Sequence, residues 1–593
     1  MKELLYPFDS DWIMKNRRKI KKRLLEDGTT RISKRIAVLG GSTTHDIIQV
    51  LELFLLNEGI QPTFYESEYG QFYQDGMFGN DALDRFAPDL IFIHTTSRNL
   101  DAAYPMVQDT KDAVSQRIAD QMHLYTRLWN NLSNKFHCTI IQNNFEFPAY
   151  RTFGNQDCVD PRGRVHFVQA LNQGFAAYAE SHSDFYIHDI QYLSAVYGLE
   201  KWSQPFYWYM YKYALSFSAI PFFASSLCQM IKSVFGKNKK ALALDLDNTL
   251  WGGVIGDDGV DGIEIGQETA LGQSYLEFQN YLRALKDKGI LLTVCSKNEP
   301  DNAMLGLKHP SGVLKPEDFA VIKANWEAKS ENVRSIAKEL NILPDSIVFV
   351  DDNPAEREIV RTYSEGVSVP ELGDVDGYIS ILERNGFFEV TAFSEDDLKR
   401  NAMYRENALR AQAEQSFTDY QAYLESLEMQ AVIRDFEPVY LPRITQLTNK
   451  SNQFNLTTKR YTESEMRAVA EDDAYIRLYG QLKDRFGDNG IVSVVIGRKM
   501  GGILHVDLWL MSCRVLKRNM ELAMLDTLVL QCKKEGIEEI RGYYYPTQKN
   551  NMVRYLYRDF GFDLVSEDEH GNSVWRLSVA GYRNQNSMIT VEE

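Results

Sequence analysis

Short, uninterrupted apolar runs recur along this chain, and longer stretches with the spacing of amphipathic helices separate them. RIAVLGGS, LIFIHTT and CTIIQNNF are such runs in the first third, and ALALDLDNT, ILLTVCSKN and SIVFVDDNP follow later. Strands that are buried on both faces have this composition, and their alternation with helices is typical of a parallel sheet. The sequence therefore predicts an α/β protein.

The length of 593 residues exceeds what one hydrophobic core can serve, so several domains are expected. Shifts in pattern and composition place the boundaries. The predicted parts are a basic helical segment (1–30), a first α/β domain (31–235), a second α/β domain (236–390), a helical connector (391–430) and a third α/β domain (431–593).

Charge and composition narrow the classes of partner. A formal charge of −17 argues against general binding of nucleic acid, so small metabolites and proteins are the expected partners. The six cysteines lie far apart and no secretory signal is recognisable, which favours a cytoplasmic location. The uncharged stretch from Tyr213 to Ile231 contains serines and a proline, so a buried helix is expected there rather than a membrane segment.

Polar residues follow three of the apolar runs of the second domain. Asp245 and Asp247 end ALALDLDNT, Ser296 follows LLTVC, and two further acids follow IVFV. The carboxyl ends of parallel strands share one edge of a sheet, where ligands bind. Clustered carboxylates favour a hard divalent cation, and Mg²⁺ fits best. Lys329, near the start of a helix, is a candidate for holding a phosphate.

These four motifs, in this order, resemble those of the haloacid dehalogenase (HAD) phosphohydrolases. The resemblance implies that Asp245 attacks phosphorus to give an aspartyl-phosphate, and that Asp247 protonates the leaving group and then activates water. It also implies a HAD Rossmann-like core with little or no cap. The implied phosphate-binding residues are Thr249, Ser296 and Lys329, and the implied metal-site residues are Asp245, Asp247 (through its main-chain carbonyl), Asp351 and Asp352.

A narrower resemblance covers the chain from about residue 240 nearly to its end. LDLDNTLWGGVIGDDG, VCSKN, VFVDDNPAERE, NKSNQFNLTTKRY and RFGDNGIV resemble the FkbH-like subfamily. Known members take glyceryl from 1,3-bisphosphoglycerate, lose the phosphate and load the acyl group onto the phosphopantetheine thiol of an acyl carrier protein. Cys295, next to Ser296, could relay the acyl group as a thiolate, or it could be an ordinary buried cysteine.

The flanking domains resemble two other families in part. IAVLGGSTTHD is similar to the nucleophile block of SGNH hydrolases, a flavodoxin-like fold, with Ser42 at the turn. The matching GxND and DxxH blocks are missing, which favours a non-catalytic, partner-binding domain over the alternative, a residual esterase. The third domain resembles an N-acetyltransferase (GNAT), with Tyr557 as its general acid. In its phosphate loop Lys517 and Asn519 replace glycines, which argues against coenzyme A binding, although Lys517 and Arg518 could still contact the phosphate of a phosphopantetheine. Asn455 lies in a polar segment that the FkbH-like resemblance favours as a cleft.

Three functions follow as hypotheses. The leading one is an acyltransferase that moves a small acyl group, glyceryl by the resemblance, from an acyl phosphate to an acyl carrier protein. The second is a Mg²⁺-dependent phosphatase of a soluble phosphorylated metabolite, and the third is a carrier-binding scaffold with a vestigial HAD centre. The sequence identifies neither the carrier, the pathway nor the oligomeric state.

Overall fold

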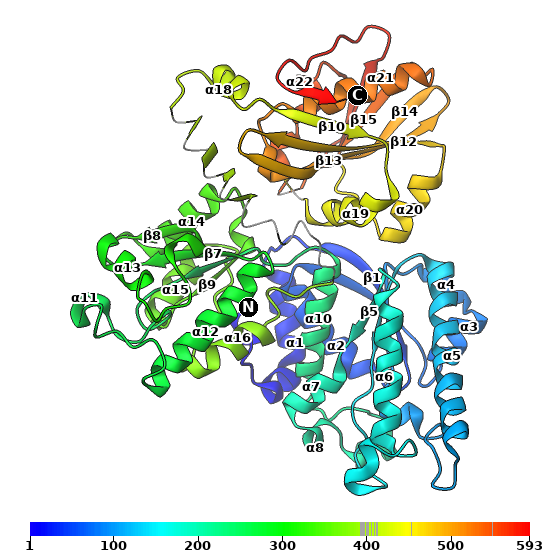
Figure 1. The fold of residues 1–593 in the computed structure, drawn as a ribbon. Helices are drawn as coiled ribbons and strands as arrows, with labels where there is room; N and C mark the ends of the chain where they lie inside the picture. Colours follow the sequence, from blue (N-terminus) through cyan, green and yellow to red (C-terminus); the bar gives the residue numbers. More distant parts are fainter. Residues whose placement is uncertain are drawn as a thin grey trace. The chain divides into compact units, whose positions relative to one another are not determined.

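The structure is a computed structural model that describes residues 1–391, 398, 403–404, 406–407, 409–410, 413–414, 416–451, 453–547 and 549–592. Figure 1 labels the helices and strands of the chain. By its internal contacts the chain divides into two compact units. One comprises Met1–Lys237 with Glu389–Ala392, and the other comprises Asn238–Phe388 with Phe393–Glu593. The first unit holds one sheet and the second holds two, which we call the first, second and third sheets in chain order.

The first sheet has five parallel strands in the order β2-β1-β3-β4-β5. Its strands are β1 (Ile32–Gly40), β2 (Ile60–Glu66), β3 (Leu90–His94), β4 (Thr139–Asn143) and β5 (Phe185–His188). β3 and β4 are buried along their whole length, as the continuous apolar runs predicted.

Helices cover both faces of the first sheet. One hydrophobic core lies under α1 (Ser10–Glu26), α2 (His45–Asn57) and α10 (Ile220–Val234), and another lies under α3 (Phe72–Phe78), α5 (Lys111–Phe136) and α6 (Arg164–Glu180). The remaining helices of this unit are α4 (Asp81–Phe86), α7 (Ile190–Tyr197), α8 (Leu199–Trp202) and α9 (Pro205–Tyr211). The predicted basic segment contributes α1, whose apolar side packs into the first core.

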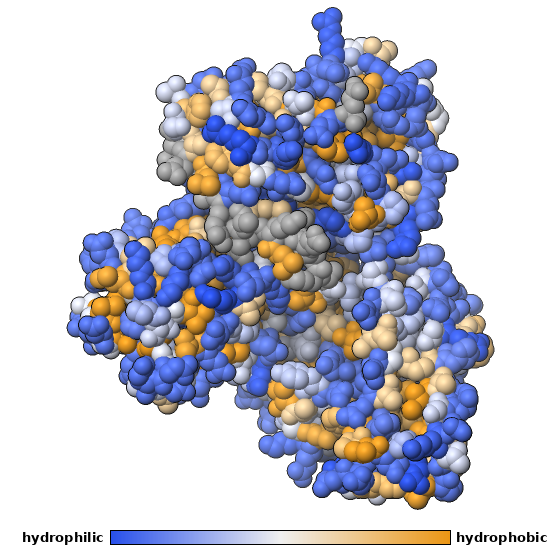
Figure 2. Space-filling view, viewed as in Figure 1, coloured by the Kyte–Doolittle hydropathy of each residue, from blue (hydrophilic) through white to orange (hydrophobic). Residues whose placement is uncertain are grey.

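The uncharged stretch that ends at Ile231 contributes most of α10, which is buried against the first sheet. None of the helices within the described residues is both long and apolar enough to span a membrane. Hydrophilic residues cover much of the face seen in Figure 2, with apolar residues in smaller groups between them.

The second sheet has four parallel strands in the order β8-β7-β6-β9. They are β6 (Ala241–Leu244), β7 (Leu291–Ser296), β8 (Phe319–Ala324) and β9 (Ile347–Val350). Its helices are α11 (Ile255–Asp258), α12 (Ala270–Asp287), α13 (Pro300–Leu307), α14 (Lys329–Glu339), α15 (Pro354–Tyr363) and α16 (Tyr378–Arg384). The central strands β6 and β7 and the edge strand β9 are buried throughout, and polar residues lie at the carboxyl end of each of them.

The third sheet is mostly antiparallel, with nine strands in the order β16-β17-β15-β14-β13-β12-β10-β18 and β11 paired with β14. The strands are β10 (Gln430–Arg434), β11 (Phe454–Asn455), β12 (Tyr475–Asp484), β13 (Gly487–Met500), β14 (Ile503–Met511), β15 (Glu539–Tyr544), β16 (Asp563–Glu567), β17 (Ser573–Ser578) and β18 (Thr590–Glu592). Its helices are α18 (Tyr420–Ser426), α19 (Leu441–Lys450), α20 (Glu463–Glu471), α21 (Met520–Lys534) and α22 (Leu556–Asp559).

The expected α/β class with several parts is confirmed by these sheets and their helices. The domain boundaries drawn from the sequence stay predictions. Much of the expected helical connector at 391–430 lies outside the described residues, although α18 falls within it.

Candidate active site

Asp245 lies directly after β6, at the carboxyl edge of the second sheet. Its main-chain N–H donates to the carbonyl of Val350 on β9, 2.9 Å away, which fixes the end of one strand against the other. The side chain is buried, and its Oδ1 has no hydrogen-bond partner among the described residues. A buried carboxylate oxygen without a partner is costly unless a ligand satisfies it.

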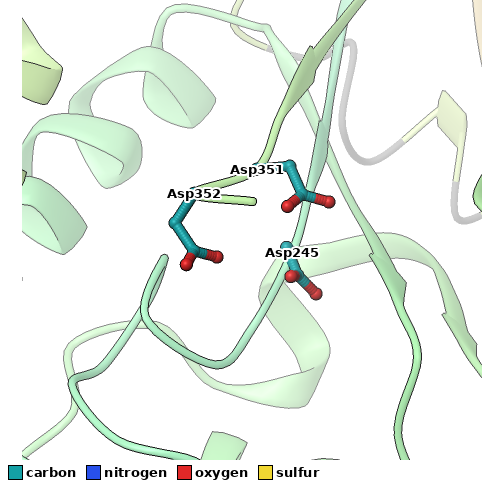
Figure 3. Close-up of side chains that lie close together, drawn as sticks. All are labelled: Asp245, Asp351 and Asp352. Carbon is teal, nitrogen blue, oxygen red and sulfur yellow. The ribbon is translucent and has the colours of Figure 1, made fainter. Parts of the chain in front are cut away.

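Asp351 and Asp352 follow β9, the neighbour of β6. One carboxylate oxygen from each of them and one from Asp245 all lie within 4.8 Å of one another. Figure 3 shows the three carboxylates directed toward a common space from the ends of the two strands. Adjacent parallel strands bring these residues together although more than a hundred positions separate them in the sequence.

Lys329 supplies the positive charge of this cluster. It is the first residue of α14 and is buried, and its Nζ lies 2.7 Å from Asp245 Oδ2 and 2.6 Å from Asp351 Oδ2. Burial alone would lower the pKa of Lys329, but the two carboxylates raise it above its ordinary value. The lysine is therefore a fixed cation beside the Asp245 carboxylate.

The acids of the cluster differ from exposed carboxyl groups in their acidity. Burial and the charge of Asp245 raise the pKa of Asp351 to about 6. The same two causes raise the pKa of Asp352. Carboxylates held together in this way resist ionising unless a cation balances them.

The cluster fits a divalent cation such as Mg²⁺. It offers only hard oxygen donors from three carboxylates, and the partnerless Oδ1 of Asp245 is among the buried atoms. Asp245, Asp351 and Asp352 are the residues that would hold the ion. When bound, such an ion supplies positive charge that draws electrons from a phosphoryl group and stabilises the charge that develops on it.

Asp247 is held apart from the three-acid cluster by its own set of donors. Its Oδ1 accepts from the Trp251 indole N–H at 2.9 Å and from the Ile255 main-chain N–H at 3.1 Å, and its Oδ2 accepts from Asn298 Nδ2 at 2.9 Å. Burial raises the pKa of Asp247, and the charge of Asp245 acts in the same direction. A carboxyl group that is oriented firmly and has a raised pKa suits proton transfer near neutral pH.

Two hydroxyl residues predicted to bind phosphate lie at this edge. The Thr249 hydroxyl accepts a hydrogen bond from the Asp352 main-chain N–H at 3.2 Å, so it positions that acid. Ser296 is the buried last residue of β7, the strand beside β6. Direct contact of Thr249 and Ser296 with phosphate stays a prediction.

Cys295, considered as an acyl relay, lies in the hydrophobic core between β7 and α14. Its side chain is fully buried, and its thiol donates to the main-chain carbonyl of Lys329 at 3.6 Å. Burial raises the pKa of this thiol. The alternation of side chains along β7 turns Cys295 away from the side that Ser296 faces. This placement agrees with the other reading of Cys295, an ordinary buried cysteine.

Sequence reasoning missed three residues that shape the site. Trp251 and Asn298 hold Asp247, and the buried guanidinium of Arg357 donates to the main-chain carbonyls of Asp351 and Asp352 at 2.8 and 2.7 Å. Asn298 offered a signal, because it comes two positions after Ser296 at a strand end. Arg357 offered none, since an arginine in a helix is ordinarily solvated.

The weaker candidates lie away from the second sheet in the chain, and each is buried. Ser42 follows β1, and its hydroxyl has no hydrogen-bond partner among the described residues. Asn455 is on β11, where its Oδ1 accepts from the Thr458 N–H at 2.8 Å. Tyr557 packs in the core of the third sheet, and burial raises its pKa. None of these three side chains is exposed to solvent.

Residues 35–232 match the family model of the FkbH N-terminal domain. A crystal structure of the N-terminal part of protein BF1531 from Bacteroides fragilis, described as containing a phosphatase domain complexed with Mg, is 30% identical. That match covers 64% of this chain and 99% of the other, with a TM-score of 0.59.

Two acetyltransferases also align, at much lower scores. They are the ribosomal-protein-S18-alanine N-acetyltransferase from Escherichia coli and Ard1 from Thermoplasma volcanium. The first is 12% identical, the match covers 27% of this chain and 99% of that chain, and the TM-score is 0.21. The second is 15% identical, the match covers 25% of this chain and 97% of that chain, and the TM-score is 0.20. Scores this low support no functional assignment. None of the curated proteins compared with the chain matches it.

Proposed function

The chain belongs to the family of the Bacteroides fragilis protein BF1531, and from this premise we propose that it is a Mg²⁺-dependent, HAD-type acyltransferase. In this proposal it takes a small acyl group, glyceryl in the leading case, from an acyl phosphate and passes it to the phosphopantetheine thiol of an acyl carrier protein. Phosphate is released, and the reaction takes place in the cytoplasm.

The observation that carries the phosphate chemistry is the Asp245 cluster. The cluster consists of a buried lysine and three converging carboxylates. One oxygen of the Asp245 carboxylate has no protein partner among the described residues. Phosphoryl groups require positive charge around their oxygens, and Lys329 provides it at a fixed position. The FkbH N-terminal match and the Mg-bound phosphatase domain of the relative support the same assignment.

The transfer to the carrier itself needs no further reactant. From 1,3-bisphosphoglycerate it gives a 3-phosphoglyceryl thioester, which becomes a glyceryl thioester only when water hydrolyses the remaining phosphate ester. The carrier's sulfur attacks the carbonyl carbon of the acyl phosphate, and the bond between that carbon and the bridging oxygen breaks. The bridging oxygen leaves with the phosphate, which also receives the thiol proton. Lys329 would stabilise the departing phosphate, and Asp247, held by Trp251 and Asn298, would carry the proton.

A phosphatase is the second candidate, and the Asp245 cluster favours it because a carboxylate nucleophile beside Lys329 requires neither a thiol nor a carrier. Here Asp245 attacks phosphorus, and the bond from phosphorus to the leaving oxygen breaks. Water then attacks the aspartyl-phosphate at phosphorus and frees Asp245. Each phosphate released by this route carries one oxygen atom from solvent.

One experiment separates the candidates. The full chain is incubated in H₂¹⁸O with Mg²⁺, 1,3-bisphosphoglycerate and a holo-acyl carrier protein, and the masses of phosphate and carrier are followed. A 3-phosphoglyceryl adduct with one unlabelled phosphate, or a glyceryl adduct with one unlabelled and one ¹⁸O-labelled phosphate, supports transfer. Labelled phosphate without an adduct supports the phosphatase, and the absence of both products supports a non-catalytic scaffold.

A further inference from the structure

A cavity opens at the carboxyl edge of the first sheet, in the unit that holds no part of the Asp245 site. It is a small hollow that opens to solvent, and the space of about 400 Å³ within its outline includes open solvent. The segments after β3 and β4 line it together with the start of α6. The residues that bear on its chemistry are Ser97, Arg98, Tyr104, Glu146, Tyr150 and Arg164, and the exposed acid Asp101 also lines it.

Arg164 is held in place by aromatic rings. The central carbon of its guanidinium lies 4.3 Å from the ring centroid of Tyr104 and 4.3 Å from that of Tyr150. Contacts of this kind engage the face of the guanidinium and leave its edge, which carries the N–H donors, free to bind. Among the described residues, no side chain or carbonyl accepts a hydrogen bond from this guanidinium.

Arg98 adds a second cation to the same cavity. Its guanidinium contacts the ring of Trp208, 5.8 Å from the centroid, and within the described part of the chain no carboxylate forms an ion pair with it. Arginines elsewhere in this unit do have carboxylate partners: Arg35 pairs with Asp89 and Arg117 with Asp109. The two cations of the cavity are therefore available to a ligand.

Glu146 places a hydrogen-bond acceptor on the cavity wall, whereas the two arginines are donors. Its side chain is 5% exposed, and its carboxylate accepts from the Ser97 hydroxyl at 2.9 Å and from the Ser97 N–H at 3.2 Å. Burial raises the pKa of Glu146. Each carboxyl oxygen retains a lone pair for one more donor, such as a ligand hydroxyl.

We propose that this cavity binds a small hydroxylated oxyanion, with Arg164 and Arg98 holding its carboxylate or phosphate group and Glu146 holding its hydroxyl. The guanidinium edge of Arg164 matches two oxygens of such a group. Tyr150, which is 58% exposed, forms the outer wall, and Tyr104, which is 6% exposed, forms the inner one. The site is separate from the Asp245 cluster and does not depend on the function proposed for it.

The first test uses the unaltered full chain. Phenylglyoxal modifies accessible arginines, and mass spectrometry of the peptides measures the rate at each position. We expect D-glycerate to slow modification of Arg164 at least about fivefold and to leave Arg151 unaffected. Arg151 is an exposed arginine of the same loop region, with a single hydrogen bond to Asn155. Equal rates at Arg164 with and without glycerate would overturn the proposal.

The second test measures affinity by calorimetry with D-glycerate and with acetate, which has no hydroxyl. Arg164→Met should weaken the binding of both at least about tenfold, because a charge-assisted bidentate contact is lost. Arg151→Met is the matched control and should change neither more than about twofold. Glu146→Gln should weaken glycerate binding more than acetate binding, and identical losses for the two ligands would remove Glu146 from the site.

Phosphate release from 1,3-bisphosphoglycerate is measured on the same variants. Arg164→Met should leave it unchanged, because Arg164 belongs to a different sheet from the Asp245 cluster. Failure of the oxyanion site would therefore appear in the glycerate measurements alone. Failure of the proposed enzymatic function would appear in the phosphate measurement alone.

Discussion

The first and second sheets place polar residues at the same topological position, the carboxyl ends of buried parallel strands, yet the two edges are built differently. In the second sheet, like charges converge on Lys329 and one oxygen of Asp245 is left without a partner. In the first sheet, His94, Asn143 and His188 pair with one another. Position at a strand end therefore does not make an active site. What distinguishes the second sheet is a cluster of charged groups around a partnerless carboxylate oxygen, whereas the partnerless buried atoms described at the strand ends of the first sheet, such as Ser42 Oγ, are uncharged.

The largest expected effect is on the enzymatic activity at the carboxyl edge of the second sheet. Asp245→Asn should lower phosphate release at least about a thousandfold, because it removes either the nucleophile or a ligand charge at the reacting group. Release of phosphate from 1,3-bisphosphoglycerate is the measurement. Asp287→Asn, which alters an exposed acid at the end of α12, should retain parental activity. Comparable rates for Asp245→Asn and the parent would refute the assignment.

At the carboxyl edge of the first sheet, we expect a substitution to change the stability of the protein rather than its activity. Asn143 Nδ2 lies 2.8 Å from His94 Nδ1, and its Oδ1 lies 2.9 Å from His188 Nδ1, all of them buried. Asn143→Ala removes the partner of His94 Nδ1 and one of the two partners of His188, whose Nε2 keeps its contact with Ser226 Oγ. It should lower the free energy of unfolding by about 3 kcal/mol. Urea unfolding measures this loss, with Asn155→Ala as an exposed control. A loss below about 1 kcal/mol would mean that water replaces the amide.

Binding of Mg²⁺ tests the site of the second sheet without a measurement of enzymatic activity. At a Mg²⁺ concentration about a hundred times its Kd, binding to the folded state should stabilise the second unit by about 2.7 kcal/mol. The rise in its thermal unfolding midpoint on adding Mg²⁺ is the readout, with EDTA reversing it. Asp351→Asn should abolish the rise, and Asp287→Asn should preserve it. An undiminished rise in Asp351→Asn would place the ion elsewhere.

Substitution of Cys295 tests whether the thiol next to Ser296 takes part in the reaction at the carboxyl edge of the second sheet. We expect Cys295→Ala to lower the unfolding free energy by about 1 kcal/mol through lost packing, and to leave acyl loading and phosphate release within about threefold of the parent. Carrier mass and free phosphate are measured together. If loading disappears while phosphate release continues, the thiol is a relay after all.

Ser42 should give the smallest effect. Its buried hydroxyl has no partner among the described residues, so Ser42→Ala removes an unsatisfied group and should change the unfolding free energy by less than about 0.5 kcal/mol. Hydrolysis of p-nitrophenyl acetate should be at background level in parent and variant alike. An esterase activity that the substitution abolishes would assign chemistry to the first sheet.

Local patterns in the sequence were sufficient for much of the fold. A buried strand must be continuously apolar, so ALALDLDNT and SIVFVDDNP predicted β6 and β9 and placed Asp245, Asp351 and Asp352 at their ends. A parallel sheet then requires strand ends to meet at one edge, which is why those acids could be grouped before their distances were known.

What the sequence by itself determined is the order of strands and helices and the chemical types at the strand ends, because both follow from periodicity over a few residues. Only the tertiary structure decided which of those groups remain without partners. The pairing of His94 with Asn143, the burial of the Cys295 thiol and the unpaired guanidinium of Arg164 all depend on residues from distant segments. Hydrogen bonding and burial are relations between such segments, so no local pattern records them.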